Sequence, residues 1–251
     1  MANTTKGRNR GENASRHAAA PNRFPILAVL VGGIVVLAIV AIIAVALSGG
    51  DDDTTPTASA TCDAPAVASS DAITVTGAAL AKPDGDTDPC IGRAAPELAG
   101  RNFAGKPVEI TNDGRAKAIV FVAHWCPHCQ REVPIISKYL ADQGLPEGVD
   151  LYLVPTSTDS SLPNYPPDEW LQREGLSDVP TLVDDDRNTA HIAYGGGAFP
   201  YLVLVDKDGK VAGRFSGELG DGAYPTLLDS LAKGEPIPGT NAGPASERPS
   251  T

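Results

Sequence analysis

Two cysteines stand at the junction between an apolar run and a helical stretch, within FVAHWCPHCQREVP (121–134). The run before them, AKAIVFVA (116–123), is short and rich in β-branched residues, which predicts a buried strand. The chain after them, from 126 to about 142, reads as a helix that Gly144 stops. A strand, a Cys-x-x-Cys motif and a helix in direct succession limit the fold more than any other feature of this chain.

The two cysteines, Cys126 and Cys129, either hold a metal or exchange electrons with other thiols. A structural zinc site needs about four ligands, usually as two close pairs. Only one pair is close here, and the histidines beside it are His124 and His128, the second of which lies inside the motif. The start of a helix, by contrast, stabilises an anion such as a thiolate through its free N–H groups and its dipole. The sequence therefore favours a redox site, with no metal and no cofactor.

The positions within the motif suggest separate roles. Cys126, at the helix start, is the expected nucleophile, and Cys129, one turn deeper on the same side, is expected to resolve the mixed disulfide. Pro127 suits a first helical turn, where its missing N–H has no helical partner. His128 adds an imidazole that favours the thiolate and so tunes the redox poise.

Strands and helices continue to alternate after the motif. This order predicts an α/β fold with helices packed around a mixed sheet. The expected elements are a strand at 149–155, helices at 166–175 and 188–194, a hairpin at 201–217 and a last helix at 225–234.

Trp125–Cys129, followed by Glu132 and Pro134, resembles the thioredoxin superfamily, in particular its membrane-anchored TlpA/ResA-like branch. The Cys-Pro-His-Cys loop itself is similar to that of DsbA-type oxidases. The resemblance covers about residues 91–233 and implies a thioredoxin-like fold with a mixed central sheet flanked by helices. It also implies that Pro200 is the cis-proline that faces the redox pair.

Some positions depart from the pattern of these domains. Many of them carry a buried acid six residues before the first cysteine, where this chain has Val120. Glu132 is the nearest candidate to replace that acid, and a surface glutamate near a helix start is the alternative. Phe199 replaces the smaller residue usual before the cis-proline. Trp125 is expected to shield the active site without taking part in the chemistry.

An uncharged apolar run of 22 residues, at 26–47, precedes this domain. About 20 such residues span the hydrocarbon core of a bilayer, so the run predicts a transmembrane helix. The segment 1–25 has a net charge of +4 and three aspartates (51–53) follow the run, which predicts a cytoplasmic N-terminus. A cleaved signal peptide is the alternative, although its apolar region would be only about 7 to 15 residues long.

The composition shifts on both sides of the domain. Residues 48–90 are rich in Ala, Asp, Thr, Ser, Pro and Gly and predict a flexible stalk, and 234–251 predict a disordered tail. Cys62 and Cys90 lie in the stalk, where an oxidising compartment favours a structural disulfide. That bridge would pin residues 73–76 onto the domain. A relay that passes electrons to the active-site pair is the alternative.

The charge of the chain limits its partners. The chain has a net charge of −11, and subtracting the +4 of the first 25 residues leaves −15 for the rest, which argues against nucleic acid. The expected partners are exported proteins with cysteine thiols or disulfides, together with a membrane redox protein that recycles the active site. We expect a single-pass protein of the plasma membrane with its domain outside the cytoplasm.

The sequence leaves the direction of electron flow open. The Cys-Pro-His-Cys loop favours a disulfide donor, because a stabilised thiolate makes the corresponding disulfide more oxidising. The TlpA/ResA-like resemblance favours a reductase, for example one that serves cytochrome c maturation. A non-enzymatic metal-binding domain on the same fold is the rival from another class.

Overall fold

A computed structural model describes residues 61–62, 64–83 and 87–240. The predicted transmembrane helix at 26–47 and the basic segment before it lie outside these residues. Within the described ranges, no helix combines the length and the apolar character that crossing a bilayer requires.

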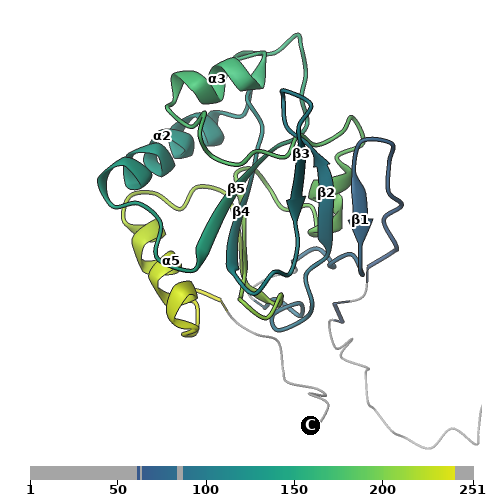
Figure 1. The fold of residues 1–251 in the computed structure, drawn as a ribbon, viewed down its shortest axis with the longest axis vertical. Coiled ribbons are helices and arrows are strands. Elements are labelled where there is room, and N and C mark those ends of the chain that lie inside the picture. Colours follow the sequence, from purple (N-terminus) through teal and green to yellow (C-terminus); the bar gives the residue numbers. More distant parts are fainter. Residues whose placement is uncertain (1–60, 63, 84–86, 241–251) are drawn as a thin grey trace, which may run out of the picture. The chain divides into compact units, whose positions relative to one another are not determined.

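A four-stranded sheet in the order β5-β4-β6-β7 carries the cysteine junction. Figure 1 labels two of its strands, β4 and β5. The central strand β4 (Ala116–Val122) pairs in parallel with β5 (Val149–Pro155) and antiparallel with β6 (Tyr201–Val205). β7 (Val211–Ser216) pairs antiparallel with β6 and forms the outer strand. Every residue of β4 and of β6 is buried, because both faces of the sheet are covered. The mixed sheet that the sequence predicts is therefore present.

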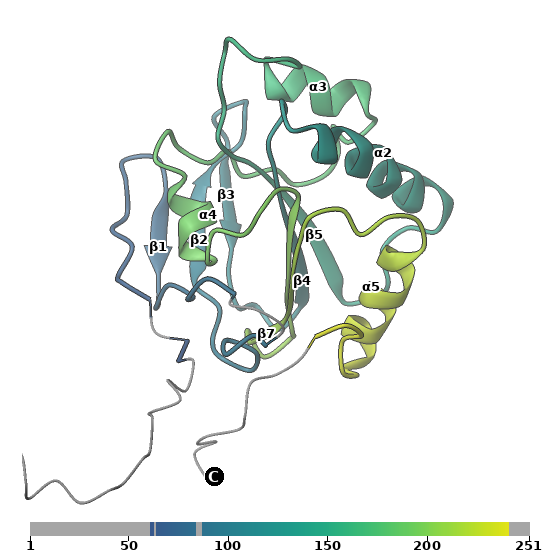
Figure 2. The ribbon, with the colours of Figure 1, turned by 180° about the vertical axis from the view of Figure 1, so that it is seen from behind.

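Alternate residues of β4 point to opposite faces of this sheet, as the pleat of a strand requires. Val120 belongs to the core that contains the buried faces of α2 (Pro127–Asp142) and α5 (Ala223–Lys233). Phe121, the next residue, belongs to the core on the other side, which contains residues of α4 (Thr189–Ala193). Figures 1 and 2 show α2 and α5 on one side of the sheet and α4 on the other.

A second sheet of three antiparallel strands lies on the α4 side (Figure 2). Its order is β1 (Thr74–Thr76), β2 (Glu97–Arg101) and β3 (Pro107–Ile110). Leu98 in the middle strand lies opposite Val75 on one neighbour and Ile110 on the other. Leu98 and Ile110 are almost fully buried, so this sheet closes the second core.

The helices follow the sequence prediction with small differences at their ends. α3 (Pro167–Arg173) occupies the region predicted at 166–175, and α4 and α5 occupy those predicted at 188–194 and 225–234. Two consecutive prolines place one at the start of α3, where a missing N–H costs nothing. Helix ends commonly vary by one or two residues, so these differences do not change the architecture.

The predicted domain start at residue 91 falls too late. The described part of the segment predicted as a stalk (48–90) belongs to the domain: Ile73 is fully buried, Leu80 is 2% exposed, and β1 adds a strand to the second sheet. A disulfide joins Cys62 to Cys90 at the base of this segment. The apolar side chains that attach the segment, Ile73 and Leu80 among them, are too widely spaced to give a periodic pattern in the sequence.

A buried ion pair also attaches this N-terminal segment to β7. The Arg214 side chain is fully buried and its Nε donates a hydrogen bond to Asp88 Oδ2 at 2.7 Å. The same guanidinium donates to the carbonyl of Ala81 at 2.7 Å, and the Cys90 N–H donates to Asp88 Oδ1 at 2.9 Å. The carboxylate and the guanidinium are thus both satisfied by groups from the two segments.

The predicted tail also begins too early. α5 ends at Lys233, and Gly234 takes the left-handed conformation (φ 67°) that commonly follows a helix. The chain then returns to the molecule, because Ile237 is only 5% exposed and belongs to the core beneath α2 and α5. The domain therefore extends to at least residue 240.

Candidate active site

The first turn of α2 follows the end of β4 with only a short turn between them. Cys126 has extended backbone angles (φ −74°, ψ 121°) and caps the helix, and Pro127 occupies the first helical turn. The Gln130 N–H donates to the Cys126 carbonyl at 3.0 Å, which closes this turn. The first turn of α2 contains no acidic residue, so the positive end of the helix dipole lies at Cys126 without a competing carboxylate from that turn.

The two sulfurs of the motif lie in different surroundings. Both cysteines are free thiols, and Cys126 is 7% exposed whereas Cys129 is fully buried. The Cys126 thiol lies 3.8 Å from the carbonyl oxygen of Phe199, and the Ala123 N–H lies 3.4 Å from Cys129 Sγ. Burial raises the pKa of the Cys129 thiol well above its usual range. Cys126 is thus the sulfur that a partner reaches first.

The residues at 199 and 200 face the motif from the start of β6. The Phe199–Pro200 peptide bond is cis, and the carbonyl of Pro200 accepts a hydrogen bond from the Gly217 N–H at 2.8 Å. The Phe199 ring meets the Trp125 ring edge-on at a centroid distance of 6.4 Å. Trp125 is half-buried, and its indole Nε1–H donates to the Ser157 carbonyl at 2.7 Å. Two aromatic rings therefore flank the approach to Cys126.

Glu132 is fully buried, which corrects the alternative of a surface glutamate. Its carboxylate accepts hydrogen bonds from the backbone N–H groups of Leu219 (3.2 and 3.3 Å) and Gly220 (3.3 Å). Its negative charge contributes to the raised pKa values of Cys129 and Tyr224, for both of which burial is the main cause. A buried carboxylate therefore lies within electrostatic reach of the inner sulfur.

His128 is exposed and turns one ring nitrogen toward an ion pair. Its Nδ1 contacts Glu218 Oε1 and lies 2.9 Å from Arg131 Nη2. The Arg131 Nε lies 3.0 and 3.1 Å from the two carboxylate oxygens of Glu218. Hydrogen bonds from Arg131 and then from His128 lower the pKa of Glu218 to about 2. Neither Arg131 nor Glu218 was singled out from the sequence, because they meet only through the fold.

His124 holds the loop behind the motif. It is buried, its Nδ1 lies 2.6 Å from the Pro163 carbonyl, and its Nε2 lies 3.1 Å from the Asp159 N–H. The carbonyl can only accept and the amide can only donate, so the ring is neutral with its proton on Nδ1. This side chain therefore anchors the long connection between β5 and α3.

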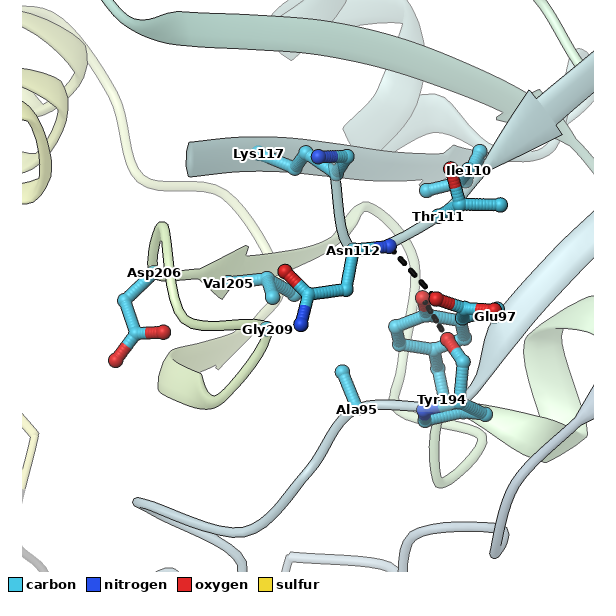
Figure 3. Close-up of a pocket in the computed structure, with 11 residues that line it drawn as sticks. Ala95, Glu97, Ile110, Thr111, Asn112, Lys117, Tyr194, Val205, Asp206 and Gly209 are labelled. Atoms are coloured by element: carbon cyan, nitrogen blue, oxygen red, sulfur yellow. Dashed lines mark hydrogen bonds between the residues drawn. The ribbon is translucent and has the colours of Figure 1, made fainter. Parts of the chain in front are cut away.

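Two cavities lie away from the predicted site residues. Among the described residues, no three His, Cys, Asp or Glu side chains approach one another closely enough to hold a metal ion. Figure 3 shows a cavity of about 20 Å³ that Glu97, Asn112 and Tyr194 help to line, which is room for roughly one water molecule. A larger cavity, of about 440 Å³, is lined by Phe103, Leu171 and Val179 among others. None of the predicted site residues lines either cavity.

Residues 91–229 match the Redoxin family. The chain belongs to this family. Thiol-disulfide oxidoreductase ResA of Bacillus anthracis is 28% identical over 130 residues, which cover 51% of this chain and 70% of that protein. Methylamine utilization protein MauD of Paracoccus denitrificans is 30% identical over 132 residues, covering 51% of this chain and 60% of MauD. The crystal structure of StoA from Bacillus subtilis has 20% identity and a TM-score of 0.41, covering 49% of this chain and 89% of StoA.

This Redoxin-family protein is a thiol-disulfide oxidoreductase with a thioredoxin-like α/β fold around a mixed sheet. The matched segment contains Cys126, Cys129, Glu132 and Pro200, together with the Glu218 side chain that contacts His128. Cys62 and Cys90 precede the matched segment.

Proposed function

We propose that this oxidoreductase is tethered to the plasma membrane through residues 26–47 and transfers disulfides to exported proteins outside the cytoplasm. The observation that carries the proposal is the contrast between Cys126, which lies at the helix start beside the Phe199 carbonyl, and the fully buried Cys129. An outer sulfur that a partner can reach and an inner sulfur that it cannot are what sequential thiol-disulfide exchange requires.

The exchange proceeds in two displacements. A partner thiolate attacks Cys126 Sγ in the oxidised protein, a disulfide forms between the partner and Cys126, and the Cys126–Cys129 bond breaks with its electron pair on Cys129. A second partner thiolate then attacks the partner sulfur of the mixed disulfide and releases Cys126 as a thiolate. The partner has lost two electrons to the cysteine pair. Of the two protons that the partner thiols released, Cys129 takes up one, and the other stays in solution while Cys126 is a thiolate. A membrane redox partner reoxidises the pair.

Glu132 is placed to move the proton of the inner sulfur. Cys129 leaves as a thiolate in a site where burial strongly favours the neutral thiol, so it must take up a proton as it leaves. Cys129 is fully buried, and the Glu132 carboxyl group, which is also fully buried, lies within electrostatic reach of it. In the reverse direction the same carboxylate accepts the Cys129 proton and activates that thiol.

The segment that ends at Phe199 is where we propose that the partner backbone binds, because Tyr201 is already paired on both sides, with Phe121 and Ser216. The Phe199 carbonyl lies close to Cys126, and the Trp125 ring stands across from Phe199. An extended partner chain that pairs with this segment brings its cysteine to Cys126 while its apolar side chains contact the two rings.

The start of α2 and the Arg131 cation, both near the outer sulfur, favour the oxidising direction. The first turn of α2 is free of acids, and Arg131 lies close enough to Cys126 for the charge of the thiolate to help raise the pKa of Arg131, after its hydrogen bond to Glu218. Groups that stabilise the Cys126 thiolate stabilise the reduced pair, which makes the disulfide a stronger oxidant.

A reductase is the second candidate, and one contact favours it. Glu218 engages both His128 and Arg131, so its negative charge offsets part of the positive charge beside Cys126. A less stabilised thiolate makes the pair more reducing, as a supplier of electrons to exported disulfides requires.

The equilibrium redox potential of the Cys126/Cys129 pair separates the two directions. A disulfide donor is expected near the range of about −120 to −180 mV, and a reductase near about −270 mV. The potential is measured on the intact chain in glutathione buffers, with Cys126→Ser as the control that removes the exchange. A pair that does not exchange with glutathione at all contradicts both directions.

Trapping checks the assignment of the two sulfurs. Cys129→Ser in the full-length protein is expected to accumulate mixed disulfides between Cys126 and envelope proteins, because the resolving sulfur is missing. The matched control is Cys126→Ser, which is expected to trap none. Accumulation with Cys126→Ser instead reverses the assignment. Cell fractionation with and without residues 26–47 checks the tether.

A further inference from the structure

A carboxylate from the segment after β7 contacts the first turns of α2. Glu218 lies 87 residues beyond Arg131 in sequence, and it contacts both His128 and Arg131. The His128 ring is 59% exposed, whereas only 30% of the Glu218 side chain is exposed. The exposed imidazole of His128 is therefore contacted at Nδ1 by a less exposed carboxylate of the same domain.

The donors and acceptors around His128 Nδ1 fix where its proton lies. Arg131 can only donate a hydrogen bond, and an ionised carboxylate can only accept one. Glu218 is ionised at neutral pH because the hydrogen bonds from Arg131 and His128 hold its pKa at about 2. Arg131 Nη2 also lies 2.9 Å from Nδ1, but it already donates to Glu218 Oε1, so we assign the Nδ1 proton to the hydrogen bond with Glu218.

We propose that Glu218 is a positioning residue that holds the proton of His128 on Nδ1 and so leaves Nε2 to exchange protons at the active-site sulfur. This inference rests on the proposed exchange through Cys126. In the neutral ring Nε2 accepts the proton of an incoming partner thiol and produces the attacking thiolate. In the charged ring Nε2 is a donor that stabilises the Cys126 thiolate. An acid that fixes the tautomer of a histidine beside a nucleophile is a known way to organise such a pair.

The surrounding segment is built to hold this carboxylate in place. Directly after Glu218, the N–H groups of Leu219 and Gly220 bind the buried Glu132 carboxylate on the inner side of α2. Gly217 and Gly220 have positive φ values of 88° and 75°, which side chains rarely tolerate, so the turn is specified by sequence. Residues 218–220 therefore contact the active-site helix at an exposed side chain and at a buried one.

The cluster also lies within electrostatic reach of the outer sulfur. The pKa of Arg131 is raised mainly by its hydrogen bond to Glu218, and the charge of Cys126 also contributes. The charged groups that contact His128 are thus Arg131 from its own helix and Glu218 from the segment after β7. The positioning role requires that a change in the charge of Glu218 acts on the sulfur through the imidazole.

A double-mutant cycle tests this route. Glu218→Gln, His128→Ser and the double variant are compared with the wild type in glutathione buffers. Because the pair is exposed, Glu218→Gln is expected to change the equilibrium constant by about two- to fivefold. In the His128→Ser background the same substitution is expected to change it no further. An equal change in both backgrounds overturns the inference, and so does no change in either.

The pH dependence of the exchange rate is the second readout. Without the carboxylate, Nδ1 loses the acceptor that holds its proton, so the pH–rate profile of the exchange is expected to differ between Glu218→Gln and the wild type. Glu218→Ser is the second variant, because the side-chain amide of Gln could itself form a hydrogen bond with His128 Nδ1. The matched control is Asp142→Asn, which removes a carboxylate paired with Lys138 on the same helix. A profile that stays in place for both Glu218 variants contradicts the role.

Failure of this inference is distinct from failure of the proposed function. If the wild type exchanges with glutathione through Cys126 and the Glu218 effects are independent of His128, only the positioning role is lost. If the wild type shows no exchange that Cys126→Ser abolishes, the proposed function itself is lost.

Discussion

Glu132 is a charged side chain in a core that is otherwise largely apolar, and its surroundings match its chemical task. Its carboxylate is inaccessible to water and is held by two backbone N–H groups. Burying a carboxylate is costly without such partners. Val120 stands at the position where many of these domains carry a buried acid, and it is fully buried and apolar. The domain thus keeps one buried acid near Cys129, on the helix instead of on the strand.

Replacing Glu132 with glutamine is expected to slow the step in which Cys129 attacks the mixed disulfide on Cys126. The amide keeps the shape and an acceptor oxygen for the Leu219 N–H, but it cannot take the Cys129 proton. A lost general base costs on the order of a hundredfold in rate. Quenched-flow mass spectrometry of the glutathione adduct measures this step. The control is Glu169→Gln, an exposed glutamate on α3. Equal rates for both variants would remove Glu132 from the mechanism.

The residues of the site that the sequence could predict are those whose signal is local. Cys126, Pro127, His128 and Cys129 form one contiguous motif, and the resemblance then places Pro200. Glu218 carries no local signal, because it reaches His128 only through the β6–β7 hairpin and the turn after it. Long-range contacts of this kind depend on strand register, which composition and spacing do not encode.

At the scale of elements, the short helix α4 connects the second core to the cis-proline segment. Five residues do not form a stable helix alone. α4 is held because the Asp184 carboxylate accepts the N–H groups of Ala190 (2.8 Å) and His191 (3.1 Å). The His191 Nε2 lies 2.8 Å from the Gly197 carbonyl, and its ring packs 4.7 Å from that of Phe199. The segment beside Cys126 is therefore supported from behind by α4.

The stability of the domain is expected to fall as the pH drops below about 6.5, the ordinary pKa of histidine. Burial lowers the pKa of His191, with the charge of Lys82 adding to the effect, so the unfolded chain takes up this proton first. The contribution of His191 to the free energy of unfolding is fully present above the pKa that this histidine has in the unfolded chain. It is lost as the pH falls toward the lower pKa that it has in the folded protein. His191→Gln should reduce the slope in urea unfolding between pH 7.5 and 5. The control is Ile192→Gln, at an exposed neighbouring residue, which should keep the slope of the wild type. A slope that is unchanged in His191→Gln contradicts the assignment of this pH dependence to His191.

At the scale of the whole molecule, the alternation of strands and helices was predictable but the boundaries of the domain were not. Apolar runs such as β4 and β6 are long enough to show a pattern, and they fix the central sheet. The segment before residue 91 contributes a strand of only three residues and a few isolated apolar side chains. Its attachment depends on the Cys62–Cys90 bridge and on the Asp88–Arg214 pair, which join residues far apart in sequence.

The Cys62–Cys90 bridge is expected to stabilise the whole domain without taking part in electron exchange. Closing a loop over a separation of 28 residues constrains the unfolded chain by about 3 kcal/mol, so the double variant Cys62→Ala, Cys90→Ala should lose about that free energy of unfolding. Limited proteolysis should then cut near β1, because the segment is no longer closed at its base.

The same bridge should stay oxidised in a glutathione buffer that reduces Cys126 and Cys129, because structural disulfides resist that pool. Mass mapping of alkylated protein across a redox series measures both pairs in one experiment, and the double variant should keep the potential of the active-site pair. Two pairs that titrate together would instead indicate a relay between them. An N-terminal segment that resists proteolysis in the double variant would show that Asp88 and Arg214 suffice to hold it, and that the bridge adds little to the native fold.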